Sequence, residues 1–181
     1  DADNALHKAR RSETASIEFF HAEMHAQAVR VLQIEAELRA ALKTSGLTVF
    51  YQPIVDLETR EPKSFEALVR WPHPTLGLLP PSEFIPLAET LDLIHDIGMN
   101  VLAEVCADLR DWARQLPEGT PLRVSVNLSA RQLARPQLAD ELLAAIDASG
   151  LAHNTIRFEV TESVLARQDG PAIDTLHALR A

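Results

Sequence analysis

The sequence is poor in cysteine, in basic residues and in long apolar runs. Cys106 is the single cysteine among 181 residues, so an internal disulfide framework is excluded and a reducing cytoplasm is the expected location. Its apolar surroundings, VLAEVCADL, predict a packed core thiol rather than a reactive one. No apolar stretch reaches the ~18 residues that a membrane helix needs, and the segment DADNALHKAR has the features of neither a signal peptide nor an anchor.

The charge balance excludes one class of partner. The chain has 17 Lys and Arg against 26 Asp and Glu, a net charge of −9, which argues against binding to a nucleic-acid polymer. With 46% hydrophobic and 24% charged residues, the composition is that of an ordinary globular protein that can bury a sizeable core. The length corresponds to one domain, or to one domain with an appendage.

The first quarter of the chain is expected to be helical. In residues 16–46, Met24, Val31 and Leu38 recur every seven residues, which predicts a connector helix or a short coiled coil. The dipeptide Ser45-Gly46 is a typical helix end.

From Leu47 onward, segments of strand pattern and helix pattern alternate. Four strands are predicted at 47–56, 64–70, 121–129 and 155–163, and helices at 87–115, 136–149 and 171–181. The Pro-rich segment 71–86 is predicted to be a loop. Strands separated by helices of this length favour a parallel sheet with right-handed crossovers, and so an α/β fold.

Three of these strands each carry an oxygen ligand on their polar face. Alternate side chains of a strand point to opposite faces, so Glu66, Leu68 and Arg70 share a face opposite the apolar side chains at 65, 67 and 69. Asn127 and Glu159 occupy the polar face of later strands in the same way. In a (β/α) barrel that face is the lumen, and its active site lies at the carboxyl ends of the strands.

This donor set favours a hard cation. Carboxylate and amide oxygens suit Mg²⁺ or Mn²⁺, and Arg70 would hold an anion that the cation activates. The alternative is structural: Glu66 and Arg70 would form a solvated ion pair, while Asn127 and Glu159 would satisfy turns. Glu162 has the opposite parity to Glu159, so it is expected at the strand exit, where it would brace a loop.

Other conspicuous residues have structural interpretations. His73 and His153 are expected to be loop histidines, because neither falls on the polar face of a strand. Trp71 and Trp112 are expected to be packing residues.

Several motifs in a fixed order resemble those of one family. The segment FEALVRW contains the triplet Glu66-Ala67-Leu68; YQPIVDL precedes it, and HPTLGLLPPSEFIPLAE, SVNLSARQL and FEVTES follow it. Together they make residues 47–181 similar to the EAL domains, which are cyclic di-GMP phosphodiesterases. The resemblance implies a TIM-type (β/α) barrel with an atypical first strand, of which the N-terminal part would be present here.

The resemblance also implies a metal site and a reaction. Glu66, Asn127 and Glu159 match three of the family's metal ligands, in a site that holds two Mg²⁺ or Mn²⁺ ions, and Glu66 is thereby a catalytic candidate. Glu162 matches a glutamate that supports a loop with further metal ligands. The implied reaction is the metal-dependent hydrolysis of cyclic di-GMP to linear pGpG in bacterial second-messenger signalling.

Three further positions match the family's substrate contacts. Gln52 matches a residue that contacts the guanine-containing substrate, and Arg70 matches one that binds its phosphate. Leu68, from the triplet, is the third substrate-binding candidate.

The head of the chain resembles a second family. DADNALHKARRS is similar to the last helix of a GGDEF, or diguanylate cyclase, domain. The expected organisation is therefore a GGDEF tail at 1–15, a connector helix at 16–46 and an EAL domain at 47–181. The expected partners are cyclic di-GMP and an upstream GGDEF domain. A homodimer, formed through the connector helix or an exposed sheet edge, is a further possibility. The parent protein is free to carry upstream membrane or sensor domains.

The sequence also departs from the family. The DDFGTG segment and a later lysine and glutamate are not found before Ala181, and four strands are predicted where a barrel of ~250 residues has eight. A truncated EAL domain, with little activity by itself, is therefore expected. The alternatives are a degenerate, non-catalytic EAL module that senses cyclic di-GMP or contacts proteins, and an assembly fragment built on the heptad helix and an exposed sheet edge.

Overall fold

The computed structural model describes residues 22–117, 120, 122–160 and 170–180, and the chain divides into two compact units, 1–40 and 41–181. The described part of the first unit belongs to helix α2 (Ala22–Lys43). Residues 16–21 of the predicted connector, and the predicted GGDEF tail, lie outside the described residues. No helix in the described part of the chain is long and apolar enough to span a membrane.

The heptad positions of α2 differ in burial along the helix. Ile34 and Leu38 are buried, whereas Val31 is 41% exposed. Gln33 donates a side-chain hydrogen bond to Glu37 on the exposed side. Of the predicted apolar stripe, Leu38 is therefore buried and Val31 is exposed.

The end of α2 and the start of the second unit follow the predicted Ser-Gly signal. Ser45 adopts a left-handed conformation (φ 51°), and the Gly46 N–H donates to the Ala41 carbonyl over 2.8 Å. A Cβ on Gly46 would lie 3.1 Å from Ala41, so the missing side chain permits this close return.

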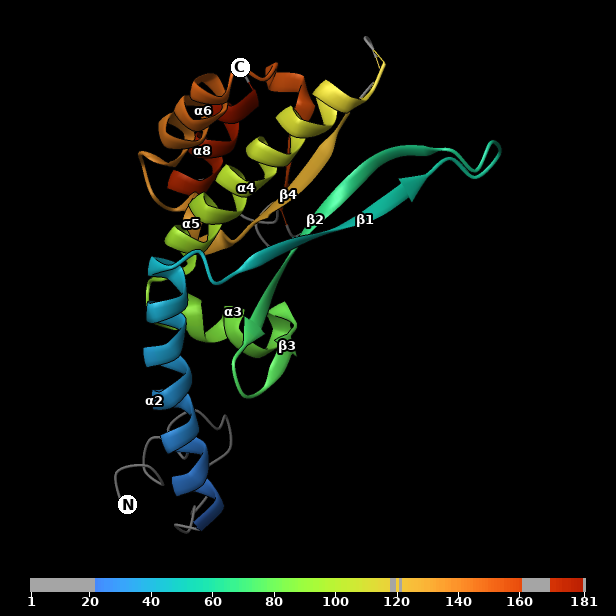
Figure 1. Ribbon diagram of the computed structural model, residues 1–181. Helices are drawn as coiled ribbons and strands as arrows, with labels where there is room; N and C mark the ends of the chain where they lie inside the picture. The colour runs from blue at the N-terminus through green and yellow to red at the C-terminus, as the bar shows by residue number, and fades with distance from the viewer. Residues whose placement is uncertain (1–21, 118–119, 121, 161–169, 181) are drawn as a thin grey trace. The chain divides into compact units, whose positions relative to one another are not determined.

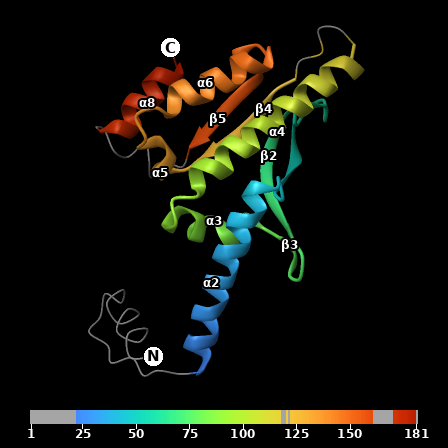
Figure 2. The ribbon, with the colours of Figure 1, turned by 60° about the vertical axis from the view of Figure 1, so that its left-hand side comes forward.

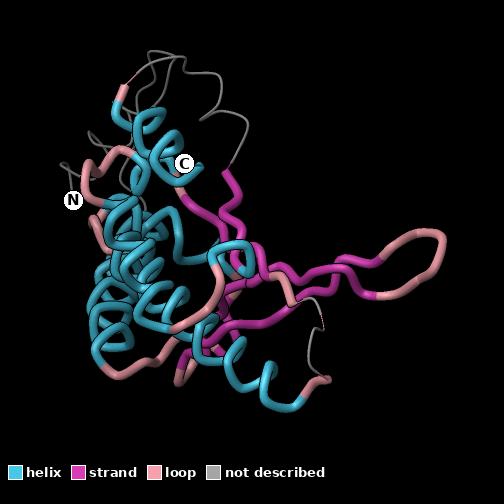
Figure 3. Tube along the Cα trace, turned by 90° about the horizontal axis from the view of Figure 1, so that it is seen from above, coloured by secondary structure: helices cyan, strands magenta, loops and turns pink. Residues whose placement is uncertain are grey.

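The second unit is built on a mixed sheet with the strand order β1-β2-β4-β5 (Figure 1). β1 (Thr48–Val55) and β2 (Pro62–His73) form an antiparallel hairpin, because their connection is too short for a crossover. β4 (Val124–Leu128) is parallel to β2, and β5 (Ile156–Val160) is parallel to β4. Seen from above in Figure 3, the hairpin extends away from the helices of this unit.

The segment predicted as a Pro-rich loop contains a strand, which corrects the sequence prediction. β3 (Gly77–Leu79) pairs with Trp71–His73 at the end of β2. Gly77 has φ 75°, and the Nδ1 atom of His73 accepts the N–H groups of Thr75 and Leu76. His73 is thus a buried strand residue that organises a tight turn, not a loop histidine, and local turn chemistry explains why the prediction was wrong.

The helical pattern predicted from about residue 87 to 115 is two helices. α3 (Pro81–Thr90) begins with proline at its first position, where the missing N–H costs no hydrogen bond. The chain then breaks at Asp92, whose φ is 59°, and α4 (Ile94–Gln115) begins. α4 packs across β1, β2 and β4, so it covers one face of the sheet (Figures 1 and 2).

The remaining helices complete the packing on that side. The short α5 (Ala130–Leu133) follows β4 directly, α6 (Leu138–Ser149) packs on α4, and α8 (Pro171–Arg180) lies beside α6 (Figure 2). The short 3₁₀ helix η1 (His153–Thr155) leads into β5. The fully buried side chains of the unit include Trp71, Phe84, Leu102, Leu109, Val124, Leu133, Leu138, Leu142 and Ile146.

Candidate functional site

Polar side chains from four neighbouring strands fall on the same face of the sheet. Gln52 is paired in register with Glu66, and Glu66 with Ser125. Asn127, two residues beyond Ser125, is paired with Glu159. Because strand side chains alternate between faces, these residues share the face opposite to α4. The register therefore brings together candidates that lie more than a hundred residues apart in sequence.

Glu66 and Asn127 are in direct contact. The Asn127 Nδ2 donates to the Glu66 Oε1 over 2.8 Å, and the Asn127 side chain remains exposed. Glu66 and Glu159 are half-buried. Glu66 is therefore held by an amide from the next parallel strand, which leaves its second carboxylate oxygen free of this bond.

This geometry fits a divalent cation. Neighbouring oxygen ligands of an octahedral Mg²⁺ with bonds of ~2.1 Å lie ~3.0 Å apart. The 2.8 Å between Asn127 Nδ2 and Glu66 Oε1 is close to that spacing, and a half-turn of the amide exchanges its nitrogen and oxygen. Within the ranges that the structure describes, no group of three His, Cys, Asp or Glu side chains could hold a metal, so the candidate set depends on the amide of Asn127.

Arg70 has partners other than Glu66. Its Nη1 donates to the Val69 carbonyl over 2.9 Å, and its guanidinium carbon lies 5.8 Å from the centre of the exposed Phe50 ring. Among the described residues, no ion pair joins Arg70 to Glu66, because the guanidinium is directed to the Val69 carbonyl and the Phe50 ring. The solvated ion pair considered as an alternative is therefore wrong for these two residues.

Leu68 is among the residues that line a largely apolar cavity of about 520 Å³. The cavity lies between β2 and β4 on one side and α3, α4 and α5 on the other; its lining includes Leu68, Asn127, Ile85, Ile97 and Leu128. Glu162 lies outside the described residues.

A structural element that the sequence analysis missed fixes the chain just after Asn127. Ser129 and Gln132 form a capping box: the Ser129 N–H donates to Gln132 Oε1 over 2.9 Å, and the Gln132 N–H donates to Ser129 Oγ over 3.4 Å. The signal was present in the sequence, because Ser129-Ala-Arg-Gln132 fits the S-x-x-Q pattern.

Comparisons with known proteins identify the family. The family model of the EAL domain matches residues 35–181. The chain is 40% identical over 180 residues to the cyclic di-GMP phosphodiesterase NbdA of Pseudomonas aeruginosa, and 38% identical over 181 residues to an uncharacterized signaling protein of Caulobacter vibrioides. These matches cover 99% and 100% of this chain, but only 23% and 22% of the relatives. The chain therefore belongs to the EAL domain family.

Solved structures agree with this assignment. The cyclic di-GMP complex of the PaMucR phosphodiesterase superposes with a TM-score of 0.76 at 36% identity, covering 82% of this chain and 59% of that one. The EAL domain of Xanthomonas citri FimX matches with a TM-score of 0.72 over 86% of this chain and 59% of its own; at 22% identity, this likeness shows the fold alone. EAL domains have a TIM-barrel-like fold, so the predicted α/β fold is confirmed. EAL phosphodiesterases as a class depend on metal ions.

Proposed function

We propose that this chain is part of a cyclic di-GMP phosphodiesterase domain, which hydrolyses one phosphodiester bond to give linear pGpG. The observation that carries the proposal is the Glu66–Asn127 contact, made across neighbouring parallel strands on the sheet face opposite to α4. The names of NbdA and of the PaMucR complex support the choice of substrate.

In this proposal Glu66, Asn127 and Glu159 hold Mg²⁺ or Mn²⁺, and Glu162 supports a neighbouring loop. The bound ion would lower the pKa of a water molecule and offset charge on the phosphoryl group. Glu66 would supply negative charge to the site, and before the ion binds the Asn127 amide holds that carboxylate.

The substrate is held by three other residues in this proposal. Arg70 uses one N–H on the Val69 carbonyl, which leaves further donors of its planar guanidinium for a phosphate oxygen. Gln52, the register partner of Glu66, places an exposed amide where it can bond a guanine edge. Leu68 shares the strand face of Glu66 and would provide an apolar contact for the purine.

The organisation of the longer protein is also proposed. Residues 1–15 would be the tail of an upstream GGDEF domain, 16–46 a connector and 47–181 the EAL part, in a cytoplasmic location. A homodimer through the connector helix or a sheet edge would be compatible with this arrangement.

The test compares Glu66→Gln with Glu58→Gln in the full-length protein. Glu58 is an exposed glutamate in the turn of the same hairpin, so it is a matched control. With Mg²⁺ or Mn²⁺ present, we expect the wild type and the control to convert cyclic di-GMP to pGpG. Glu66→Gln should lower kcat at least about a hundredfold, because it removes a charged oxygen ligand.

Two other results would contradict the proposal. Equal turnover by Glu66→Gln and the control would show that Glu66 is not part of the active site. Metal-independent binding of cyclic di-GMP without hydrolysis by the wild type would favour the non-catalytic sensing module.

A further inference from the structure

Helix α4 presents a row of side chains to the start of the sheet. Asn100, Glu104, Asp108 and Trp112 are spaced by four residues, which places them along one ridge of the helix. The last three contact β1 or β2, and we call Glu104, Asp108 and Trp112 the α4 clamp. Asn100 donates to the carbonyl of Leu42, in the last turn of α2, over 3.4 Å.

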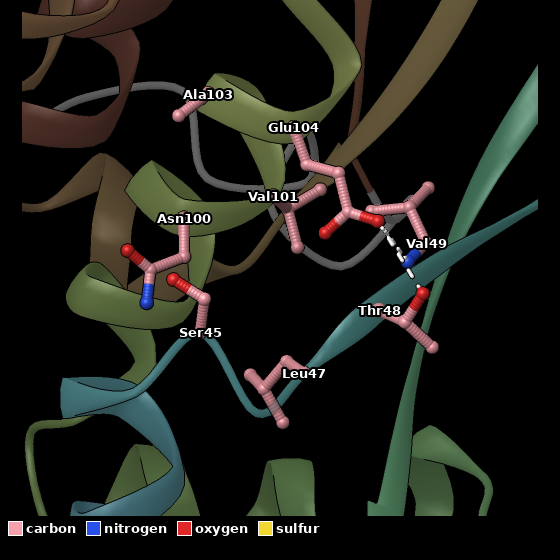
Figure 4. A pocket seen from close by; sticks show the side chains of 8 residues that line it. All are labelled: Ser45, Leu47, Thr48, Val49, Asn100, Val101, Ala103 and Glu104. Carbon is pink, nitrogen blue, oxygen red and sulfur yellow. Dashed lines mark hydrogen bonds between the residues drawn. The ribbon is translucent and has the colours of Figure 1, made fainter. Parts of the chain in front are cut away.

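Glu104 makes the first contact between the α4 clamp and β1. The Glu104 Oε1 accepts the Val49 N–H over 2.8 Å and lies 3.4 Å from the Thr48 hydroxyl (Figure 4). A pocket of about 280 Å³ lies beside these bonds, lined by Ser45, Leu47, Asn100 and Ala103 among others (Figure 4). Because that space is not filled by side chains, the start of β1 depends on the carboxylate as well as on apolar packing.

Asp108 and Trp112 make the second set of contacts, on the face of the sheet opposite to the candidate site. The Tyr51 hydroxyl donates to Asp108 Oδ2 over 2.6 Å, and the Tyr51 ring packs edge-on against Trp112 with centroids 4.6 Å apart. The Phe65 ring lies 5.8 Å from the same Trp112. Trp112 thus contacts one residue of β1 and one residue of β2.

These two contacted residues are the chain neighbours of two site candidates. Tyr51 precedes Gln52, Phe65 precedes Glu66, and Gln52 and Glu66 are register partners. Since neighbouring side chains of a strand point to opposite faces, the clamp holds Tyr51 and Phe65 on one face while Gln52 and Glu66 project from the other.

We propose that Asp108 and Trp112 are positioning residues, which fix Gln52 against Glu66 by holding Tyr51 and Phe65 from behind. This inference rests on the proposed function, in which Gln52 binds the guanine and Glu66 holds the metal. Because these contacts order β1 before cyclic di-GMP arrives, binding does not have to supply the free energy of ordering it. The clamp thus raises the fraction of molecules in which Gln52 is already in place to bind.

The proposal predicts a separation between substrate binding and metal binding. Gln52 lies on β1, which the clamp holds, whereas Glu66 and Asn127 lie on β2 and β4, which pair with each other independently of β1. Weakening the Asp108–Tyr51 contact, which engages β1 and not β2, should therefore raise KM for cyclic di-GMP. It should leave kcat and the metal concentration for half-maximal activity close to their wild-type values.

The test uses the full-length protein with Asp108→Ala, Asp108→Asn and Tyr51→Phe. Asp111→Ala is the matched control, an exposed carboxylate on the same helix that pairs with Arg114 at 2.7 Å. Asp108→Ala and Tyr51→Phe should raise KM roughly fivefold, the change expected from losing one ordinary hydrogen bond. Asp108→Asn keeps an oxygen that accepts the Tyr51 hydroxyl, so it should restore most of the affinity.

Amide hydrogen exchange provides a readout that does not need the reaction. In Asp108→Ala, exchange should accelerate over 48–55 and stay unchanged over 124–128. If the wild type fails to hydrolyse cyclic di-GMP, the proposed function is wrong. The exchange pattern then tests by itself whether Asp108 holds β1 in place. The clamp is overturned if Asp108→Ala matches Asp111→Ala in KM and in exchange, or if KM, kcat and metal requirement all change together, as a general structural loss would produce.

Discussion

Replacing Gly98 by alanine should destabilise the protein even though Gly98 lies inside a helix. A Cβ at this position would lie 2.1 Å from Nε2 of Gln132, so the Gln132 side chain would have to move. Gln132 is only 2% exposed and its Oε1 accepts the Ser129 N–H. The substitution therefore disturbs the capping box that follows β4 and Asn127.

The magnitude follows from two opposing terms. Alanine in place of glycine favours a helix interior by ~1 kcal/mol. Losing the capping interaction costs ~1 kcal/mol, and a buried amide without partners costs a further ~1–3 kcal/mol. We expect Gly98→Ala to lower the free energy of unfolding by about 1–3 kcal/mol in sum.

A double-mutant cycle with Gln132→Ala tests this reasoning by urea unfolding. When Gln132 is already truncated, the clash is gone, so Gly98→Ala should now stabilise the protein by ~0.5–1 kcal/mol. The sign of the Gly98→Ala effect should thus reverse between the two backgrounds. An effect of the same sign and size in both would refute the proposed contact between Gly98 and Gln132.

Three further predictions concern single groups. Tyr51 is the only tyrosine; burial and then the Asp108 hydrogen bond raise its pKa above the ordinary ~10, so its stabilisation is complete below pH ~10 and is lost above it. Tyrosinate absorbance should therefore appear only with alkaline unfolding, and ionisation of the folded protein near pH 10 would contradict this. The ion pair with Lys63, followed by backbone N–H bonds, lowers the pKa of Asp56 to about 2. Its contribution is present above pH ~4 and is lost as the pH falls towards 2, and an NMR titration midpoint near 4 would be the opposing result. Burial raises the pKa of the Cys106 thiol, which is 5% exposed, so a thiol reagent should label it only on unfolding, and rapid labelling of the folded protein would be inconsistent with the core packing.

The sequence was sufficient for features that depend on period and order. Strand alternation predicted that Glu66, Leu68 and Arg70 share a face, and all three lie on one strand, β2. The register adds that Gln52 pairs with Glu66 and Asn127 with Glu159. The alternation of strands and helices predicted the α/β class. A helix of this length between two successive strands is typical of the crossover connection that joins parallel strands.

Features that depend on tertiary contacts were not predictable in the same way. β3 is too short to show a period, and it forms because it pairs with the end of β2, where His73 accepts two backbone N–H groups. The break at Asp92 requires a left-handed backbone conformation at that residue, and the sequence has no glycine or proline there that would predict it. The direct Glu66–Asn127 bond depends on the register between β2 and β4, which parity alone does not fix.

The most direct test of the central claim is a crystal structure of the full-length protein with Mn²⁺ and cyclic di-GMP, read through the anomalous signal of manganese. The account predicts a manganese peak within about 2.0–2.6 Å of Glu66 and of Asn127 Oδ1, with the amide turned from the orientation in which its Nδ2 donates to Glu66. It predicts Glu159 beside that peak and a phosphate of the ligand facing Arg70. Manganese bound elsewhere, with Asn127 Nδ2 still bonded to Glu66 in the ligand complex, would contradict it.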